Sequence, residues 1–329
     1  MKHRVLTLLF TALLLRPAAG LSAGQPELKR YEGSVDAMGG AFTIVAYGDD
    51  AARLETSVAA ALEEARRLDD LLSNYRPESE WSRVNQLAGK QPVRISQELF
   101  DLLSACVEYS RESEGAFDIT VGPLMKVWGF YKGTGHLPHR AEVRGALDRV
   151  GWRNIQLDSA ARTVHFARPG VEIDPGGIGK GYAVDRLAAI LERQGVRRAL
   201  ISAASSSIYA IGAPPHERGW RIGIKDPKDH LKTVATVWLR DQSMSTSGNY
   251  EKFFYAEGKM YSHIMDPRTG YPSMGTLSVS VITPRTIDSE AWAKPYYILG
   301  RDWAAKHRKK EFRIFYCEDR LDTPCAWLQ

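Results

Sequence analysis

A glycine-rich segment near the middle of the chain sets tight limits on the fold. It reads Asp174-Pro-Gly-Gly-Ile-Gly-Lys-Gly181, directly after a short β-like piece and directly before a helical pattern. Glycines allow dihedral angles closed to other residues and let backbone approach a ligand, and free N–H groups at a helix start favour a phosphate. The spacing matches neither the Walker loop nor the Gly-x-Gly-x-x-Gly fingerprint. The segment predicts either a phosphate-binding turn or a plain tight connection from strand to helix.

Hydrophobic periodicity along the rest of the chain predicts strands and helices in mixed order. Residues 41–47 are typical of a strand, and the segment from Leu54 to Leu72 repeats apolar residues at helical spacing. Ser96 is the expected N-cap of a helix that ends before Gly115. Further strands are expected at 154–157, 163–166, 171–173, 199–202, 220–224, 234–239 and 277–282, and further helices at 179–194 and 290–299. This irregular order predicts an α+β fold, and without repeats or linkers we expect one compact unit with two lobes.

The first 23 residues differ from the rest of the chain. Lys2, His3 and Arg4 precede an apolar run and a small-residue step at Ser22-Ala23, which is the outline of a secretory signal peptide. The apolar run has about eleven residues, fewer than the roughly 20 that a membrane-spanning helix needs. We therefore expect residues 1–23 to be a signal peptide and residues 30–329 to form an exported, soluble, periplasmic domain without a lipid-attachment cysteine. An uncleaved anchor is the alternative.

Charge does not point to a nucleic-acid partner. The chain has 44 Lys and Arg against 39 Asp and Glu, a formal charge of +5, and removing the leader's three basic residues leaves 41 against 39, or +2. The dense basic stretch from Lys306 to Lys310 is typical of a solvated helix face. A basic isoelectric point therefore says little about binding partners here.

The three cysteines have no metal-site spacing. Cys106 falls in an amphipathic helical pattern and is expected to be buried as a small apolar group. Cys317 and Cys325 are close in sequence near the end of a chain predicted to be exported, so a disulfide between them is one possibility, although sequence alone does not fix the geometry.

A second segment carries a candidate catalytic side chain. His263 follows a predicted strand and precedes a turn marked by Asp266-Pro267 and Gly270. A neutral imidazole at such a position can take a proton from an attacking hydroxyl. By itself, however, a lone histidine is more often structural than catalytic.

Taken together and in this order, the two segments resemble the ApbE-like FAD:protein FMN transferases. Four further segments are similar to blocks of that family, and the resemblance spans roughly residues 34 to 300. They are Met38-Gly-Gly-Ala-Phe42, Ser73-Asn-Tyr-Arg-Pro77 with Ser79 to Asn85, Gly115-Ala-Phe-Asp-Ile-Thr-Val-Gly-Pro-Leu124, and Trp220-Arg-Ile-Gly-Ile-Lys-Asp-Pro227.

The resemblance implies a T-fold-related architecture with mixed, mainly antiparallel sheets and packed helices. It implies that a Thr or Ser hydroxyl of an exported flavoprotein or membrane redox subunit takes FMN from FAD, with release of AMP. His263 would be the general base. FAD contacts would come from Met38, Tyr75, Ala116, Phe117, Asp118, Asp174, Lys180 and Ile264. Tyr75 could stack on an aromatic ring and Lys180 could offset the diphosphate charge, with ordinary core packing as the alternative for Met38 and Tyr75.

The family's magnesium ion is the least certain carry-over. Its ligands there are a backbone carbonyl in the glycine-rich turn, here Gly177, and an Asp-x-x-x-Thr on a late helix, here Glu290 and Lys294. A glutamate keeps an oxygen ligand, but an ammonium about 4 Å from a divalent cation costs roughly 8 kcal/mol at an effective dielectric near 20. Either Lys294 points away from the ion or its charge replaces the ion, with Asp288 helping to place a weaker metal. The long, flexible lysine stem favours the first arrangement. An exposed helix start rich in acidic residues is the structural alternative for this group.

A second departure lies at residues 203–209, where the family usually shows Gly-Gly-Asp and this chain has Ala-Ala-Ser-Ser-Ser-Ile-Tyr. The serines could donate hydrogen bonds near the ligand or form a small-residue strand packed on a helix. Both departures leave two other functions open. One is a non-catalytic FAD-binding or delivery protein, and the other is an FAD pyrophosphatase that uses water as acceptor.

Overall fold

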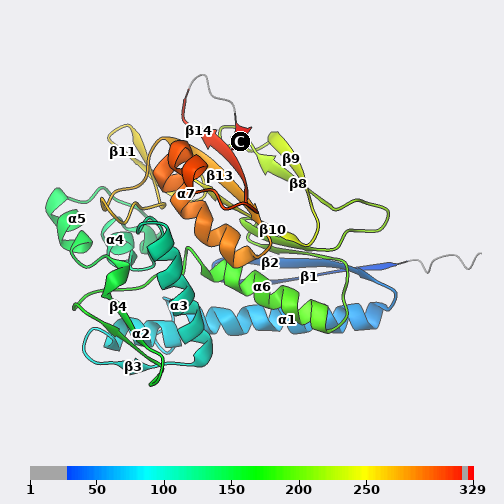
Figure 1. Cartoon of the computed structure of the whole chain (residues 1–329), viewed down its shortest axis with the longest axis horizontal. Helices are drawn as coiled ribbons and strands as arrows, with labels where there is room; N and C mark the ends of the chain where they lie inside the picture. Colours follow the sequence, from blue (N-terminus) through cyan, green and yellow to red (C-terminus); the bar gives the residue numbers. More distant parts are fainter. Residues whose placement is uncertain (1–27, 321–324) are drawn as a thin grey trace, which may run out of the picture.

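The computed structural model describes residues 28–320 and 325–329, so the predicted signal peptide lies outside the described residues. An eight-stranded sheet forms the centre of the molecule (Figure 1), and every neighbouring pair of its strands is antiparallel. Its strands, in spatial order, are β1 (Lys29–Ala37), β2 (Gly40–Gly48), β6 (Ala199–Ala203), β7 (Ser207–Ile211), β10 (Gln242–Gly248), β13 (Thr276–Thr283), β14 (Arg313–Glu318) and β15 (Ala326–Trp327).

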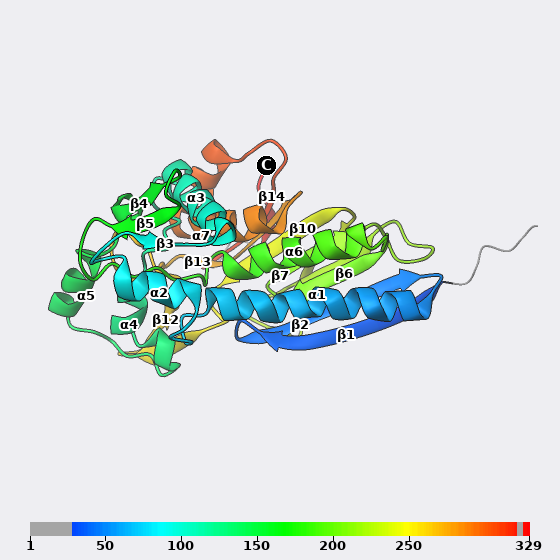
Figure 2. The same cartoon turned by 90° about the horizontal axis from the view of Figure 1, so that it is seen from below.

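Three long helices cover one face of this sheet: α1 (Ala51–Leu72), α6 (Gly179–Arg193) and α7 (Thr286–His307). Helices α1 and α6 run side by side along β1, β2 and β6 (Figure 2). The apolar stripe predicted from Leu54 to Leu72 faces the sheet and is buried, because a stripe at helical spacing can be removed from water only on one side. Within α7, Gly300 has φ 80°, a left-handed conformation that bends the element near its end.

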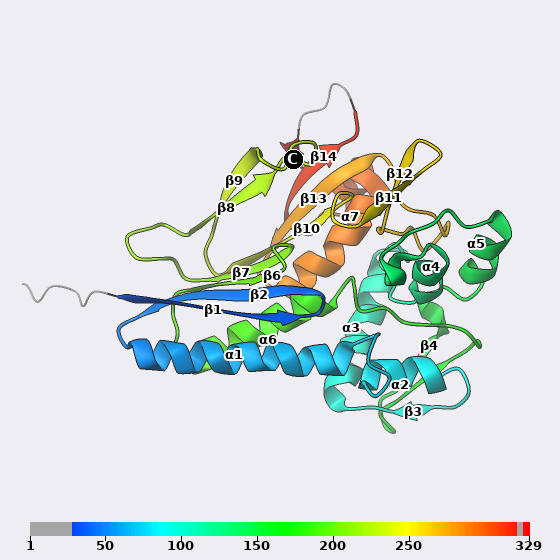
Figure 3. The same ribbon diagram turned by 180° about the vertical axis from the view of Figure 1, so that it is seen from behind.

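A two-stranded ribbon covers the opposite face, formed by β8 (Trp220–Lys225) and β9 (Thr233–Leu239) (Figure 3). The side chains of β7 point alternately to the two faces of the sheet and are apolar on both, so both faces must be shielded from water. Ile208 and Ala210 pack in the cluster that contains Trp220, whereas Tyr209 and Ile211 pack in the cluster of α1 and α6.

A second group of elements packs at one end of the sheet, beside α7 (Figure 1). Its helices are α2 (Glu80–Leu87), α3 (Gln97–Glu112), α4 (Gly122–Val127) and α5 (Arg140–Leu147), with 3-10 turns η1 (Phe130–Lys132) and η2 (Trp152–Asn154). Its strands are β3 (Val93–Arg94), β5 (Thr163–Phe166) and β4 (Ile155–Asp158), which form one small sheet, and the hairpin β11 (Phe253–Ala256) and β12 (Lys259–Ser262). One apolar cluster joins α2 and α3 to α7 and β13, so the group shares a core with the main sheet.

The α+β prediction is confirmed, and the differences from the predicted elements have local causes. The expected strand at 171–173 is wrong, because Glu172 makes only an isolated bridge to Val121. Helix α7 starts at Thr286, four residues before the predicted start. The disulfide between Cys317 and Cys325 is formed, and Cys106 is buried as expected. None of the helices within the described residues is both long and apolar enough to cross a membrane.

Candidate active site

The glycine-rich turn is held in place by side chains from α2. The Asn85 side chain pairs with the backbone of Ile173 in the way a neighbouring strand would. Its amide donates to the Ile173 carbonyl at 2.9 Å, and its oxygen accepts from the Ile173 N–H at 2.8 Å. The indole of Trp81 donates to the same carbonyl at 3.0 Å, and the Asp174 N–H donates to the Ile119 carbonyl at 2.7 Å. These bonds satisfy the buried backbone before the turn without a regular strand.

Asp174 organises the turn that follows it. Its buried carboxylate accepts from the Gly176 N–H at 2.7 Å, the Asn74 amide at 2.9 Å and the Tyr131 hydroxyl at 2.6 Å. Burial raises the pKa of Asp174, while these donors and the charge of Lys252 act in the opposite direction. A Cβ on Gly176 would lie 2.7 Å from the carboxylate, so only glycine fits there. Asp174 therefore shapes the turn from within.

Helices α6 and α7 pack unusually closely at the start of α6. The Gly181 N–H donates to the Glu290 carboxylate, and a Cβ on Gly181 would lie 2.6 Å from the Thr286 carbonyl. Asp185 of α6 accepts from the N–H groups of Thr286 at 2.7 Å and Ile287 at 3.0 Å, so it caps α7 from outside that helix. This capping explains why α7 begins before its predicted start. The same two hydrogen bonds fix the position of α7 along α6, which brings the part of α7 that carries Lys294 against the glycine-rich turn.

Lys294 lies at that point of contact. Its Cε is 3.7 Å from the place a Cβ on Gly177 would occupy. Its ammonium donates to the backbone carbonyl of Glu290 at 3.2 Å and lies 3.9 Å from a Glu290 carboxylate oxygen. Burial lowers the pKa of Lys294, the Glu290 charge raises it, and the Lys180 charge lowers it. The side chain thus points into the pocket, contrary to the arrangement that its flexible stem favoured, because the Glu290 backbone and side chain both hold the ammonium there.

Lys180 and the serine segment meet at the β6–β7 turn. The Lys180 ammonium donates to the Ser206 hydroxyl at 3.0 Å. Ser207 is buried and accepts from Ser245 at 3.2 Å, and Ser245 is 2.8 Å from Ser289 of α7. Ser206 thus accepts a hydrogen bond from a lysine, and Ser207 begins a strand that packs beside α7, which agrees with the small-residue strand that was one of the two expectations.

His263 is half-buried, and its orientation is set by Lys252. The Nδ1 atom is 3.2 Å from the Lys252 carbonyl oxygen, which also accepts the His263 N–H at 2.9 Å. Because a carbonyl has no proton to give, this contact favours the tautomer with its proton on Nδ1 and a free lone pair on Nε2. Burial lowers the pKa of His263 to about 4, and the charges of Lys252, Lys294 and Lys180 lower it too. The imidazole is therefore neutral at physiological pH and has the protonation state of a base.

Asp118 is buried, and its hydrogen bonds hold the loop that lines one side of the pocket. One oxygen accepts from the Thr120 N–H at 2.8 Å and hydroxyl at 2.6 Å, and the other accepts from the Trp152 N–H at 2.7 Å. Burial raises the pKa of Asp118 to about 6 despite these donors. Next to it, the ring of Phe117 lies 3.4 Å from the position of a Gly177 Cβ, which brings this loop against the glycine-rich turn.

These segments line one pocket. Eight of the predicted site residues take part: Ala116, Phe117, Asp118, Asp174, Gly177, His263, Ile264 and Lys294. Ile119, Val121, Met125, Gly176, Met265, Pro267 and Ile298 complete the lining. The glycine-rich turn and the histidine turn, 86 residues apart by sequence number (263 − 177), thus share a cavity.

The other predicted residues lie around the pocket or away from it. Tyr75 is 72% exposed and makes a T-shaped contact with Tyr131, with ring centroids 6.2 Å apart, so most of its side chain is open to solvent. Met38 Sδ lies 3.9 Å from the position of a Gly179 Cβ, beneath the start of α6. Asp288 is not brought to the pocket, because its oxygens accept from Arg285 and from the Tyr109 hydroxyl.

The residues at the expected metal position do not fit a divalent cation. One Glu290 oxygen is taken by the Gly181 N–H and the other faces the Lys294 ammonium. Lys294 has no acceptor atom to offer a metal. Within residues 28–320 and 325–329, no group of three or more His, Cys, Asp or Glu side chains is arranged to hold a metal ion.

Sequence reasoning missed several positioning residues. Tyr131 and Lys252 belong to no block of the resemblance, and only the fold brings them to Asp174 and His263. Asp185 lies beyond the glycine-rich segment, inside the helix predicted at 179–194, where a carboxylate gave no sign of capping another helix.

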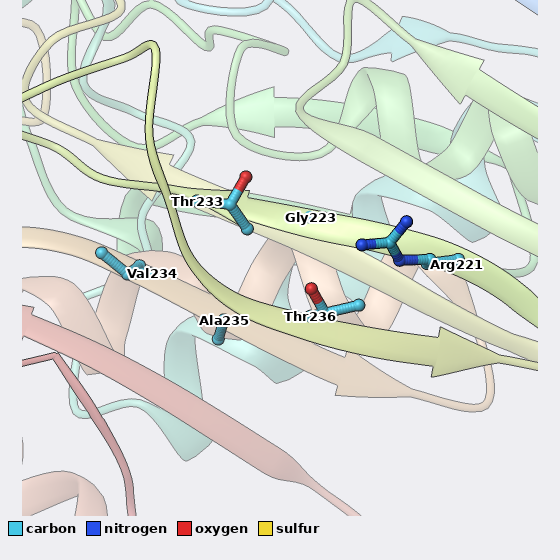
Figure 4. A pocket seen from close by; sticks show the side chains of 6 residues that line it. All are labelled: Arg221, Gly223, Thr233, Val234, Ala235 and Thr236. Carbon is cyan, nitrogen blue, oxygen red and sulfur yellow. The ribbon is translucent and has the colours of Figure 1, made fainter.

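A second surface hollow is unconnected with these residues (Figure 4). It lies on the β8–β9 ribbon, with Arg221 of β8 and Thr233 and Thr236 of β9 among its lining. No predicted site residue takes part in it.

Comparison with known proteins identifies the family. Residues 38–314 match the model of the ApbE family. The chain is 34% identical over 298 residues to an FAD:protein FMN transferase of Klebsiella pneumoniae, covering 88% of this chain and 90% of that protein. Its fold superposes on the ApbE protein of Thermotoga maritima with a TM-score of 0.82 at 29% identity, covering 88% and 95% of the two chains. The flavin transferase ApbE of Vibrio cholerae gives 0.79 at 25% identity, covering 92% and 97%. The chain therefore belongs to the ApbE family.

Proposed function

We propose that residues 30–329 act as one catalytic unit that transfers FMN from FAD to a Thr or Ser hydroxyl of an acceptor protein. The relatives named above carry this activity in their names. The observation that carries the proposal for this chain is the shared pocket, in which the glycine-rich turn after Asp174 faces the imidazole of His263. A turn that binds the diphosphate and a base that takes the hydroxyl proton, in one cavity, are what transfer from a diphosphate to a hydroxyl requires.

The turn and its neighbours would hold the FAD. The positive end of the α6 dipole would favour an anion, and the ammonium groups of Lys180 and Lys294 would add positive charge beside it. Ala116, Phe117 and Ile264 contribute apolar lining that would exclude water from the phosphates. The exposed ring of Tyr75 is available to stack on one of the two ring systems of FAD.

The reaction needs one proton transfer and one displacement. The acceptor hydroxyl attacks the phosphorus on the FMN side of the diphosphate, and its proton passes to Nε2 of His263. The new bond joins the hydroxyl oxygen to that phosphorus. The bond from that phosphorus to the bridging oxygen breaks, and AMP leaves with the oxygen. Such chemistry depends on positioning and charge stabilisation more than on covalent help.

We further propose that the protein is exported to the periplasm and that its acceptor is an exported flavoprotein or a membrane redox subunit. The leader pattern of residues 1–23 supports export. The Cys317–Cys325 disulfide also supports it, because disulfides persist mainly in oxidising compartments.

The test incubates the protein with FAD and candidate acceptor domains, followed by intact-mass and peptide analysis of the acceptor. A covalent FMN on an acceptor Thr or Ser, with equimolar AMP, is the expected result. AMP formed at the same rate without an acceptor would make the protein an FAD pyrophosphatase. FAD bound with no AMP and no adduct, across several acceptors, would make it a binding or delivery protein.

A further inference from the structure

Lys294 is a half-buried cation that lines the pocket. It stands on α7 where the resemblance expects an oxygen ligand of a metal. The chain has placed an ammonium there instead, against the glycine-rich turn at Gly177. Partial burial of a lysine without a strong acceptor is costly, because removal from water penalises its charge.

The contacts that Lys294 makes within the protein satisfy it only in part. Its ammonium has three N–H donors, and the structure gives it one hydrogen bond, to the Glu290 carbonyl at 3.2 Å. The Glu290 carboxylate oxygen at 3.9 Å is beyond hydrogen-bond distance. Donors thus remain for a ligand in the pocket, and a cation that lines a pocket selects an anion.

The surrounding charges favour an anion over a second cation. The charge of Lys180 acts on Lys294, and the charges of both lysines act on His263, so a further cation in this region is disfavoured. Glu290, the carboxylate at the metal position, already accepts the Gly181 N–H at the junction of α6 and α7. Its remaining charge faces the ammonium.

We propose that Lys294 takes the place of the divalent cation: its ammonium binds the diphosphate of FAD directly, so that FAD binding by this chain needs no metal ion. This inference rests on the proposed function, since it assumes that FAD is the ligand. In it, Lys294 and Lys180 supply two positive charges for the two negative charges of the diphosphate. Glu290 becomes a positioning residue that holds the ammonium toward the Gly177 turn.

The experiment measures the dissociation constant of FAD for the full chain by flavin fluorescence, once with excess EDTA and once with excess Mg²⁺. Wild type is expected to bind FAD with the two constants within about twofold of each other. Lys294→Met, which keeps the length of the stem, is expected to weaken binding more than tenfold under both conditions. Lys306→Met, on the exposed end of the same helix, is the matched control and is expected to change neither constant.

Lys294→Thr returns the residue type expected from the resemblance, and it frees Glu290. It is expected to bind FAD more than tenfold more tightly with Mg²⁺ than with EDTA, and its melting temperature shows whether the fold is kept. If wild type itself binds FAD at least tenfold more weakly in EDTA and Mg²⁺ restores binding, the inference is wrong while the proposed function stands. If no FAD binds under either condition, the proposed function and the inference both fail.

Discussion

Replacement of His263 by alanine separates binding from chemistry in this site. The imidazole Nδ1 is bonded to the Lys252 carbonyl, so that Nε2 is the atom free to accept a proton. No contact in the described part of the chain makes His263 a support for the glycine-rich turn. We therefore expect His263→Ala to leave the dissociation constant of FAD within about threefold of wild type while slowing FMN transfer.

The expected loss of transfer rate in His263→Ala follows from the pKa of His263. General base catalysis contributes roughly 10²- to 10⁴-fold, and a base is most effective when its pKa is near the working pH. A pKa of about 4 makes His263 a weak base that is always in the correct form near neutrality. We therefore expect a loss near the lower end of the range, about 100-fold. His165→Ala, a histidine on β5 of the small sheet, is the matched control and is expected to retain full activity.

The pH profile of kcat/KM for FAD gives a second readout, because it reports groups in the free enzyme. Only the unprotonated imidazole can accept the proton, so the rate falls as pH falls through the folded-state pKa. With a pKa of about 4, the contribution of His263 is constant from pH 6 to 8 and is halved near pH 4. A histidine with the ordinary pKa of about 6.5 would instead halve the rate near that pH. Circular dichroism at each pH checks that the fold is intact.

Two results would refute this reasoning. If His263→Ala weakened FAD binding as much as it slowed transfer, His263 would be a binding group. If transfer were unchanged in the variant, the hydroxyl would lose its proton elsewhere.

Four other changes test the framework of the site. Gly181→Ala places a Cβ 2.6 Å from an α7 carbonyl, and such overpacking is expected to cost about 1–3 kcal/mol of unfolding free energy in urea titrations. Asp185→Ala removes the two hydrogen bonds that cap α7, which should cost about 1–2 kcal/mol in the same assay. Cys325→Ser opens a disulfide that joins Cys317 across a separation of 8, and loop-closure entropy sets the expected loss at about 2.5 kcal/mol. Tyr75→Ala, at an exposed side chain, should leave the melting temperature unchanged and weaken FAD binding by about fivefold, which is near 1 kcal/mol of stacking.

The parts of the fold that could be predicted are those with a strong local pattern. The helix from Leu54 to Leu72 was clear because its apolar stripe repeats over about five turns and is buried on one face only. Strand β10 was missed for the opposite reason. Its inward positions at Ser243 and Ser245 carry hydroxyls that bond to Ser289 of α7, so no apolar alternation marks it.

In the candidate site, too, contiguous motifs could be recognised from sequence, whereas residues that come from distant parts of the chain could not. The glycine-rich turn and the histidine turn could be recognised because each is a contiguous run of residues with its own turn chemistry. Asn85, Tyr131 and Lys252 hold those turns in place from distant parts of the chain, and their identities carry no signal of that task. Residues that only position others become visible once the fold has brought them into contact.

Lys294 shows how a sequence position and a structural context together decide a chemical role. Its place in the resemblance pointed to a metal ligand, and its residue type argued against one, so the sequence left two arrangements open. The deciding facts are the register of α7, fixed by Asp185, and the closeness allowed by Gly181, which together bring the ammonium to Gly177. A one-residue change in that register would turn position 294 by about 100° around the helix, away from the pocket. The cap that Asp185 provides is thus tied to the charge of the binding site, and Asp185→Ala should weaken FAD binding as well as stability. Loss of stability with unchanged FAD affinity would show that the register is fixed by packing alone.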